Sequence, residues 1–129
     1  MQFVVITTIF PPTNMFSSNV FDKDIQFLVI GDDKTPIDWS YPSVNFLSIK
    51  DQENIGYSIT KWLPHSHYSR KNIGYIYAKR SGATSIIDTD DDNFPKSNWH
   101  YPVISDTYRV APEDLGFTNV YEYFSNRYG

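Results

Sequence analysis

The fold is decided by the stretch Gln2-Phe-Val-Val-Ile-Thr-Thr8, which is followed closely by the pair Pro11-Pro12. Nearly every residue in it is apolar or β-branched, without alternation between apolar and polar positions. A continuous run of this kind is typical of a strand that is buried on both faces, as in a parallel sheet. Ile25-Gln-Phe-Leu-Val-Ile30 repeats the pattern and is stopped by Gly31. Residues 13–24, between the two runs, are long enough for a short, weakly amphipathic helix.

The next segment along the chain predicts a third strand over residues 44–47 and then a helix. Ser48, with Asp51 three residues later, matches the pattern of a capping box at a helix start. Pro64 stops this helix. The apolar residues that share one face of it are Ile55, Ile59, Trp62 and Leu63.

A second helix is predicted with Ser69 as its N-cap and with its end at Gly82. Gly74 lies inside it at a cost of about 1 kcal/mol relative to alanine, which indicates close backbone packing at that position. Residues 84–87 form a fourth strand. Strands that alternate with helices predict an α/β fold with a largely parallel sheet and right-handed crossovers.

Length and composition narrow the class of protein. The chain has 129 residues, which favours a single domain over residues 1–129. It contains no cysteine, which excludes a disulfide scaffold, a zinc–thiolate site and a cysteine nucleophile. The net charge of −4 argues against a generic nucleic-acid binder. Because no apolar run approaches the length of a membrane span, we expect a soluble, cytoplasmic protein.

The acidic residues are concentrated at one place. Twelve of the fifteen are aspartates, and the predicted fourth strand is followed by Asp88, Asp90, Asp91 and Asp92. Ligands of open α/β sheets bind beyond the carboxyl ends of the strands, where this cluster should lie. Its hard oxygen donors suit Mg²⁺, Mn²⁺ or Ca²⁺, with substrate phosphate as a natural further ligand.

The aspartate cluster has three alternative interpretations. A solvated turn rich in aspartate stays open. An EF-hand loop does not fit, because Asn93 stands at the position of its glycine and Trp99 at that of its closing glutamate. A phosphatase-like Asp-x-Asp-x-Thr pattern does not fit either, since Asp92 stands where the threonine should be.

Polar residues elsewhere are candidates for the same site. Arg70 and Lys71 open the second helix, where two cations are unfavourable unless an anion is held there. Arg70 is suited to bind a diphosphate. The alternative is that Arg70 and Lys71 are surface cations that balance the charge of the acidic cluster. Asp32 follows the second strand and either faces a base or ribose or belongs to a plain turn. His65 and His67 lack a third metal ligand at a suitable spacing, which favours structural or solvent-exposed roles.

Four blocks in this order resemble one family. They are the stretches over residues 4–13 (Val-Val-Ile-Thr-Thr-Ile-Phe-Pro-Pro-Thr), 29–36 (Val-Ile-Gly-Asp-Asp-Lys-Thr-Pro), 69–78 (Ser-Arg-Lys-Asn-Ile-Gly-Tyr-Ile-Tyr-Ala) and 87–93 (Ile-Asp-Thr-Asp-Asp-Asp-Asn). The series is similar to the STELLO-type glycosyltransferase-like proteins, a branch of the nucleotide-sugar transferases with the GT-A fold. The resemblance covers about residues 3–93.

The resemblance implies a Rossmann-like GT-A fold, with residues 1–93 as the nucleotide half. Residues 94–129 lack periodicity and contain scattered prolines, which predicts an irregular segment that covers the sheet. The resemblance also implies a nucleoside site at Thr8, Ile9 and Phe10, with Asp32 on the base or ribose. Arg70 and Lys71 would face the diphosphate. Asp90 and Asp92 match the Asp-x-Asp motif for Mn²⁺ or Mg²⁺, with Asp88 and Asp91 as register alternatives.

The function implied is that of a metal-dependent glycosyltransferase, or its donor-binding domain, that uses a nucleoside-diphosphate sugar with UDP favoured. The acceptor is unknown, no nucleic acid is expected, and a homo-oligomer or a partner protein stays open. The alternative is a non-catalytic nucleotide-sugar or metal-binding module that assists a partner enzyme. Glu113 and Asp114 follow the Asp-x-Asp motif too closely to match the family's catalytic base.

Overall fold

A computed structural model describes residues 1–17, 21, 24–100 and 107. Its core is a four-stranded parallel sheet in the order β3-β2-β1-β4. The strands are β1 (Gln2–Thr8), β2 (Ile25–Gly31), β3 (Val44–Leu47) and β4 (Ser85–Asp88). The predicted α/β fold with a parallel sheet is thereby confirmed. Glu113, Asp114 and most of the predicted covering segment lie outside the described residues.

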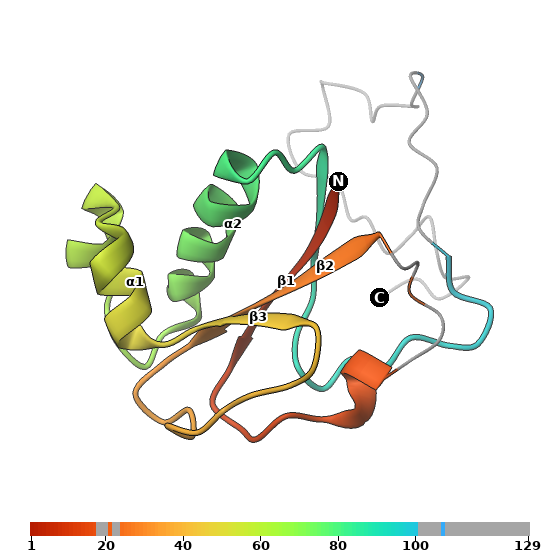
Figure 1. Cartoon of the computed structure of the whole chain (residues 1–129), viewed down its shortest axis with the longest axis horizontal. Helices are drawn as coiled ribbons and strands as arrows, with labels where there is room; N and C mark the ends of the chain where they lie inside the picture. Colours follow the sequence, from red (N-terminus) through yellow and green to blue (C-terminus); the bar gives the residue numbers. More distant parts are fainter. Residues whose placement is uncertain (18–20, 22–23, 101–106, 108–129) are drawn as a thin grey trace, which may run out of the picture.

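The two central strands are buried on both faces, as their uninterrupted apolar sequences predict. Val4, Ile6 and Val29 pack with Met15 on one face, beside the short 3-10 helix η1 (Asn14–Ser17). On the other face the core residues are Phe3, Val5, Leu28, Ile30, Ala78 and Ala83. Figure 1 shows α1 (Ile49–Ile55) and α2 (Lys71–Arg80) together on one side of the sheet, and η1 on the opposite side. Of the helix predicted over residues 13–24, the described part contains only η1.

The helix predicted up to Pro64 is shorter in the structure. The capping box is present, because the Ser48 hydroxyl accepts from the Asp51 backbone N–H and the Asp51 carboxylate accepts from that of Ser48. The helix α1 then ends at Gly56, which has a left-handed φ of 72°. A 3-10 helix, η2 (Ser58–Lys61), follows. Trp62 is the C-cap of η2 and is 84% exposed, so the prediction that it shares one face of a continuous helix with Ile55 is wrong.

The second helix begins later than predicted but packs as closely as Gly74 indicated. A 3-10 turn, η3 (Tyr68–Arg70), precedes α2, and its N-cap is His67, whose ring accepts from the Ser69 backbone N–H. Ser69 is therefore not the N-cap. A Cβ atom at Gly74 would lie 2.5 Å from Cγ1 of Val5 in β1, so only glycine lets helix and strand approach this closely. Gly82 follows the helix with a φ of 87°.

The strand order creates a switch point next to β1. The chain moves from β1 to β2 and β3 on one side, then returns through α1 and α2 to place β4 on the other side. At such a point the connections leave opposite faces of the sheet and a crevice opens beyond the carboxyl ends of the two strands. Here those ends are Thr8 and Asp88. In the described part of the chain, no helix combines the length and apolar character that a membrane crossing needs.

Candidate functional site

A cavity of about 410 Å³ lies at the carboxyl end of the sheet, around the switch point. Residues 7–10 after β1 and residues 90–92 after β4 line it, together with Asp32 and Lys34 after β2 and residues 66–68 before α2. The structure thus brings together most of the residues that the sequence singled out. They are Thr8, Ile9, Phe10, Asp32, Asp90, Asp91 and Asp92.

One wall of the cavity belongs to the carboxylate turn, which we define as residues 88–92. Lys71, the first residue of α2, reaches into this turn. Its ammonium donates to Asp88 Oδ1 at 2.7 Å, to Asp90 Oδ1 at 2.9 Å and to the backbone carbonyl of Thr89 at 2.9 Å. The Lys71 side chain is only 8% exposed, whereas Asp88 and Asp90 are 61% and 67% exposed.

These contacts determine the charge state of the turn. Burial, the largest single influence, lowers the pKa of Lys71, but the hydrogen bonds and the charge attraction of Asp88 and Asp90 together outweigh it, and the pKa lies above the ordinary value of 10.5. Burial, reinforced by the carboxylate of Asp88, also raises the pKa of the Tyr75 phenol. At neutral pH the ammonium is therefore charged and the phenol is neutral. Lys71 forms ion pairs with the acidic cluster, which is the alternative that the sequence left open for this residue. It does not line the cavity.

Asp91, also in the turn, contacts the end of β1. The Thr8 hydroxyl donates a short hydrogen bond to Asp91 Oδ2. The Thr13 hydroxyl donates to the Asp91 carbonyl at 3.4 Å. Asp92 is exposed and lines the cavity. The turn is thus attached to α2 on one side and to β1 on the other.

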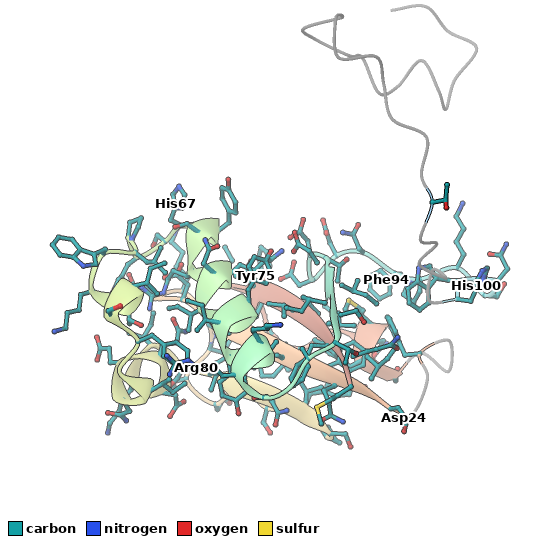
Figure 2. All side chains as sticks on the ribbon, turned by 90° about the horizontal axis from the view of Figure 1, so that it is seen from above. Asp24, His67, Tyr75, Arg80, Phe94 and His100 are labelled. Atoms are coloured by element: carbon teal, nitrogen blue, oxygen red, sulfur yellow. The ribbon has the colours of Figure 1, made fainter. Side chains whose placement is uncertain are left out.

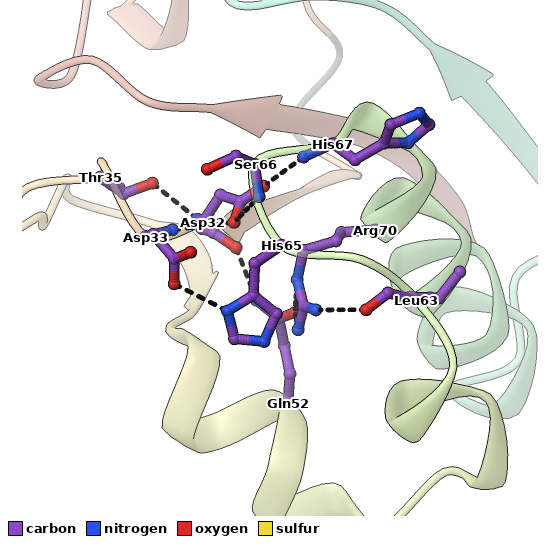
Figure 3. A network of polar contacts seen from close by, with 10 residues as sticks. Asp32, Asp33, Thr35, Gln52, Leu63, His65, Ser66, His67 and Arg70 are labelled. Carbon is purple, nitrogen blue, oxygen red and sulfur yellow. Dashed lines mark hydrogen bonds and ion pairs between the residues drawn. The ribbon is translucent and has the colours of Figure 1, made fainter.

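Arg70 lies in a different place from the one expected of a diphosphate ligand. Its side chain is 1% exposed, and Nε and Nη2 donate to Gln52 Oε1 at 3.0 and 2.6 Å. Nη1 donates to the Leu63 carbonyl at 3.3 Å. Gln52 in turn donates to the carbonyls of Gly31 and Leu47, at the ends of β2 and β3. Arg70 therefore links η3 to α1 and through Gln52 to the sheet (Figure 3), and it does not line the cavity.

Asp32 lies on the opposite wall of the cavity, and both Asp32 and Asp33 contact the loop over residues 65–67. The carboxylate of Asp32 accepts from the backbone N–H groups of Ser66 at 2.8 Å and His67 at 3.0 Å. Asp33 Oδ1 lies 2.8 Å from Nδ1 of His65. Ser66 has a φ of 52°, an uncommon conformation for a residue other than glycine, which these contacts stabilise. Figure 3 shows both aspartates against this loop, so the two histidines have structural partners here.

Some lining residues were not recognised in the sequence. Lys34 is the cation among the described lining residues, and Tyr68, 77% exposed, brings an aromatic ring. Lys34 could have been found, because it follows the second strand closely at the end where ligands bind. Tyr68 carried no such signal, since a long connection separates it from the strands. In Figure 2 the neighbouring His67 lies far from Phe94 and His100, which are at the opposite end of the side chains drawn.

The strand order and the carboxylate-lined cavity at the switch point define a Rossmann-like α/β domain. Over 90 residues, 70% of this chain, it is 37% identical to "Probable glycosyltransferase STELLO1" of Arabidopsis thaliana. It is 36% identical over the same share to "Probable glycosyltransferase STELLO2" of that plant. The chain is therefore a relative of the STELLO-type glycosyltransferase-like family, as the four sequence blocks predicted. The matched part spans 12% of each curated relative, and no family model matches the chain.

Proposed function

We propose that this chain binds a nucleoside-diphosphate sugar in the cavity at the switch point, as a metal-dependent glycosyltransferase or its donor-binding domain. The observation that carries the proposal is the cavity itself, where the end of β1 and three aspartates of the carboxylate turn meet. Ligands of doubly wound sheets occupy this position. The similarity to proteins named as probable glycosyltransferases supports the same class of reaction.

The cavity offers different chemistry along its length. Thr8, Ile9 and Phe10 would line the nucleoside, since apolar and aromatic surface is exposed there, with Phe10 58% exposed. Asp32 lies at the β2 side with its carboxylate engaged by two backbone N–H groups. A carboxylate oxygen has two lone pairs, so Asp32 retains capacity to accept from a base or ribose. A UDP-sugar is the donor that the family resemblance favours.

Lys34 is the better candidate for contact with the diphosphate. It is exposed and lines the cavity, whereas the donors of Arg70 and Lys71 are used by groups of the protein. A lysine ammonium binds phosphate as a point charge and needs no fixed geometry. We therefore assign the direct contact to Lys34, and a supporting role behind the cavity wall to Arg70.

The residues present suit a hard divalent cation. Asp90, Asp91 and Asp92 contribute carboxylate oxygens to one cavity, and such oxygens favour Mn²⁺ or Mg²⁺. Within the described residues, no three aspartate, glutamate or histidine side chains converge as a complete ligand set. Mg²⁺ commonly uses one or two carboxylates and completes its shell with substrate phosphates and water. We assign Asp90 and Asp92 as the ligands.

Cleavage of the sugar–phosphate bond leaves negative charge on the departing diphosphate. A bound divalent ion supplies neutralisation of that charge. The carboxylate turn would hold the ion, Lys34 would orient the phosphates, and the walls formed by residues 7–10 and 66–68 would limit access of water. Binding without turnover, in a module that assists a partner enzyme, is the alternative.

Calorimetric titration with UDP, in the presence and absence of Mn²⁺, tests the binding site. We expect Mn²⁺-dependent binding that Asp92→Ala abolishes and Lys34→Ala weakens by about tenfold, the size of one charge-assisted contact. Lys50→Ala is the matched control, because Lys50 is an exposed lysine outside the cavity lining. Tight UDP binding that ignores Mn²⁺ and survives Asp92→Ala would overturn the site.

Turnover is tested separately from binding. Release of free nucleoside diphosphate from a panel of nucleotide sugars, with water or added acceptors, would identify a transferase. Metal-dependent binding of UDP without release from any sugar would favour the non-catalytic module. Asp92→Ala is the inactive control in both experiments, because a protein that no longer binds the nucleotide can show neither binding nor turnover.

A further inference from the structure

The ammonium of Lys71 is surrounded by oxygen atoms in the manner of a bound cation. Two carboxylate oxygens, one each from Asp88 and Asp90, and the carbonyl oxygen of Thr89 lie 2.7 to 2.9 Å from Nζ. The side chain that delivers the charge is almost wholly buried. Carboxylates and backbone carbonyls are also the donors with which proteins bind hard metal ions.

The position of Lys71 explains why its ammonium needs these oxygen acceptors. It is the first residue of α2, where the positive end of the helix dipole disfavours a cation. Three oxygen acceptors compensate for that location and for the burial of the charge. Asp88 and Asp90 also need the ammonium, since two carboxylates directed at one point repel each other when no cation lies between them.

We propose that Lys71 is a built-in cation of the carboxylate turn, which holds Asp88 and Asp90 in place and leaves Asp92, together with the second oxygen of Asp90, to bind an external divalent ion. Lys71 is thus a positioning residue, and it removes Asp88 from the candidate metal ligands. The part that concerns the external ion rests on the function proposed above. The part that concerns the turn does not, because it describes the protein before any ligand binds.

The lining of the cavity supports this division of the aspartates. Asp90, Asp91 and Asp92 line the cavity, whereas Asp88 does not. Asp88 belongs to the last position of β4, and its side chain meets both Lys71 and the neighbourhood of Tyr75. Asp91 is joined to Thr8. Of the four carboxylates, Asp92 alone has no hydrogen bond or ion pair to another side chain of the described residues.

The proposal is tested by asking whether a divalent ion can replace the Lys71 ammonium in stabilising the carboxylate turn. In Lys71→Met the ammonium is lost and three oxygens of the carboxylate turn remain without a cation, so the turn should bind a divalent ion through them. We expect Lys71→Met to melt at a lower temperature than wild type in EDTA, and millimolar Mn²⁺ or Ca²⁺ to restore at least about half of the difference. Adding Asp88→Asn to Lys71→Met should remove most of the restoration.

The control is Lys79→Met, because Lys79 is an exposed lysine of the same helix. The divalent ions should change the melting temperature of this variant no more than that of wild type. A merely structural lysine would also be destabilised by the substitution but would gain nothing from a divalent ion. The proposal is overturned if Lys71→Met melts like wild type in EDTA, if the ions do not restore it, or if Asp88→Asn does not matter.

A second measurement covers the case in which Lys71→Met does not fold. Binding of Mn²⁺ to the full-length chain, followed by the loss of its free-ion EPR signal, is compared for Asp88→Asn and Asp92→Asn. We expect Asp88→Asn to stay within about threefold of wild type and Asp92→Asn to lose at least about tenfold in affinity. Tenfold loss in Asp88→Asn would make Asp88 a ligand and refute the assignment.

Failure of this inference and failure of the proposed function give different results. If wild type binds no Mn²⁺ with or without UDP, the metal-dependent function is wrong, while ion-dependent restoration of Lys71→Met would still support the built-in cation. If wild type binds Mn²⁺ through Asp88, the function survives and the inference is lost.

Discussion

Gly74→Ala is the substitution for which the structure makes the sharpest energetic prediction. A Cβ atom at this position would lie 2.5 Å from Val5 Cγ1 and 3.0 Å from Ile30 Cγ1. Carbon atoms in favourable contact are about 3.5–4.0 Å apart. Val5 is fully buried and pairs with Leu28 on one side and Asp88 on the other, so its strand cannot move aside. The helix α2 must shift instead.

Two opposing terms decide the magnitude. Alanine favours a helix interior over glycine by about 1 kcal/mol. Overpacking of a rigid core costs typically 1–3 kcal/mol, and this contact belongs at the upper end because the neighbour is a β-branched side chain in a central strand. We therefore expect Gly74→Ala to lower the free energy of unfolding by about 1–2 kcal/mol, with a fall in Tm of roughly 3–10 °C.

Urea denaturation of wild type and variants measures this difference. Lys79→Ala, on an exposed position of the same helix, should change the free energy of unfolding by less than about 0.5 kcal/mol. In the Val5→Ala background the nearest obstructing methyl group is absent and only the contact with Ile30 remains, so the cost of Gly74→Ala should become clearly smaller. A Gly74→Ala protein more stable than wild type, or an equal loss in the Val5→Ala background, would refute the packing argument.

Three further predictions concern the residues that hold the site. Ser48→Ala removes the hydroxyl that caps α1 and should cost about 1 kcal/mol in a urea titration, while an unchanged midpoint would contradict the capping role. Gln52→Leu leaves the buried Arg70 guanidinium without its main acceptor, so unfolding should become easier by about 3 kcal/mol, and a loss below about 1 kcal/mol would show that another group replaces it. The raised pKa of Lys71 means that its stabilising contribution is complete below pH 10.5 and is lost as the pH rises through the folded-state value. Wild type should therefore lose more stability than Lys71→Met between neutral and strongly alkaline pH, and parallel curves would contradict this.

The sheet was predictable because its strands carry their own signal. The runs at residues 2–8 and 25–30 are apolar without alternation, and this pattern is typical of a parallel strand that is buried on both faces. The break in the first long helix was not predicted. The spacing of Ile55, Ile59 and Leu63 suits a continuous helix, but Gly56 lets the chain take a left-handed turn that ends it.

The site was predictable as a place but not in its side-chain contacts. Strand ends meet at one edge of a parallel sheet, which placed Thr8 and the aspartates together without knowledge of any contact. The directions of Arg70 and Lys71 could not be predicted in this way. Adjacent residues point about 100° apart on a helix, and their partners are distant in sequence, Gln52 18 residues before Arg70 and Asp88 17 residues after Lys71.

The buried guanidinium of Arg70 has a consequence at a distance. Among the described residues its acceptors are the neutral oxygens of Gln52 and Leu63, so no carboxylate cancels its charge. Arginine stays protonated under all physiological conditions. Because Arg70 is buried, its charge is screened less by salt than that of an exposed side chain. If the cavity binds an anion, as proposed above, Arg70 contributes a positive term to the electrostatic potential that this anion meets, without touching it.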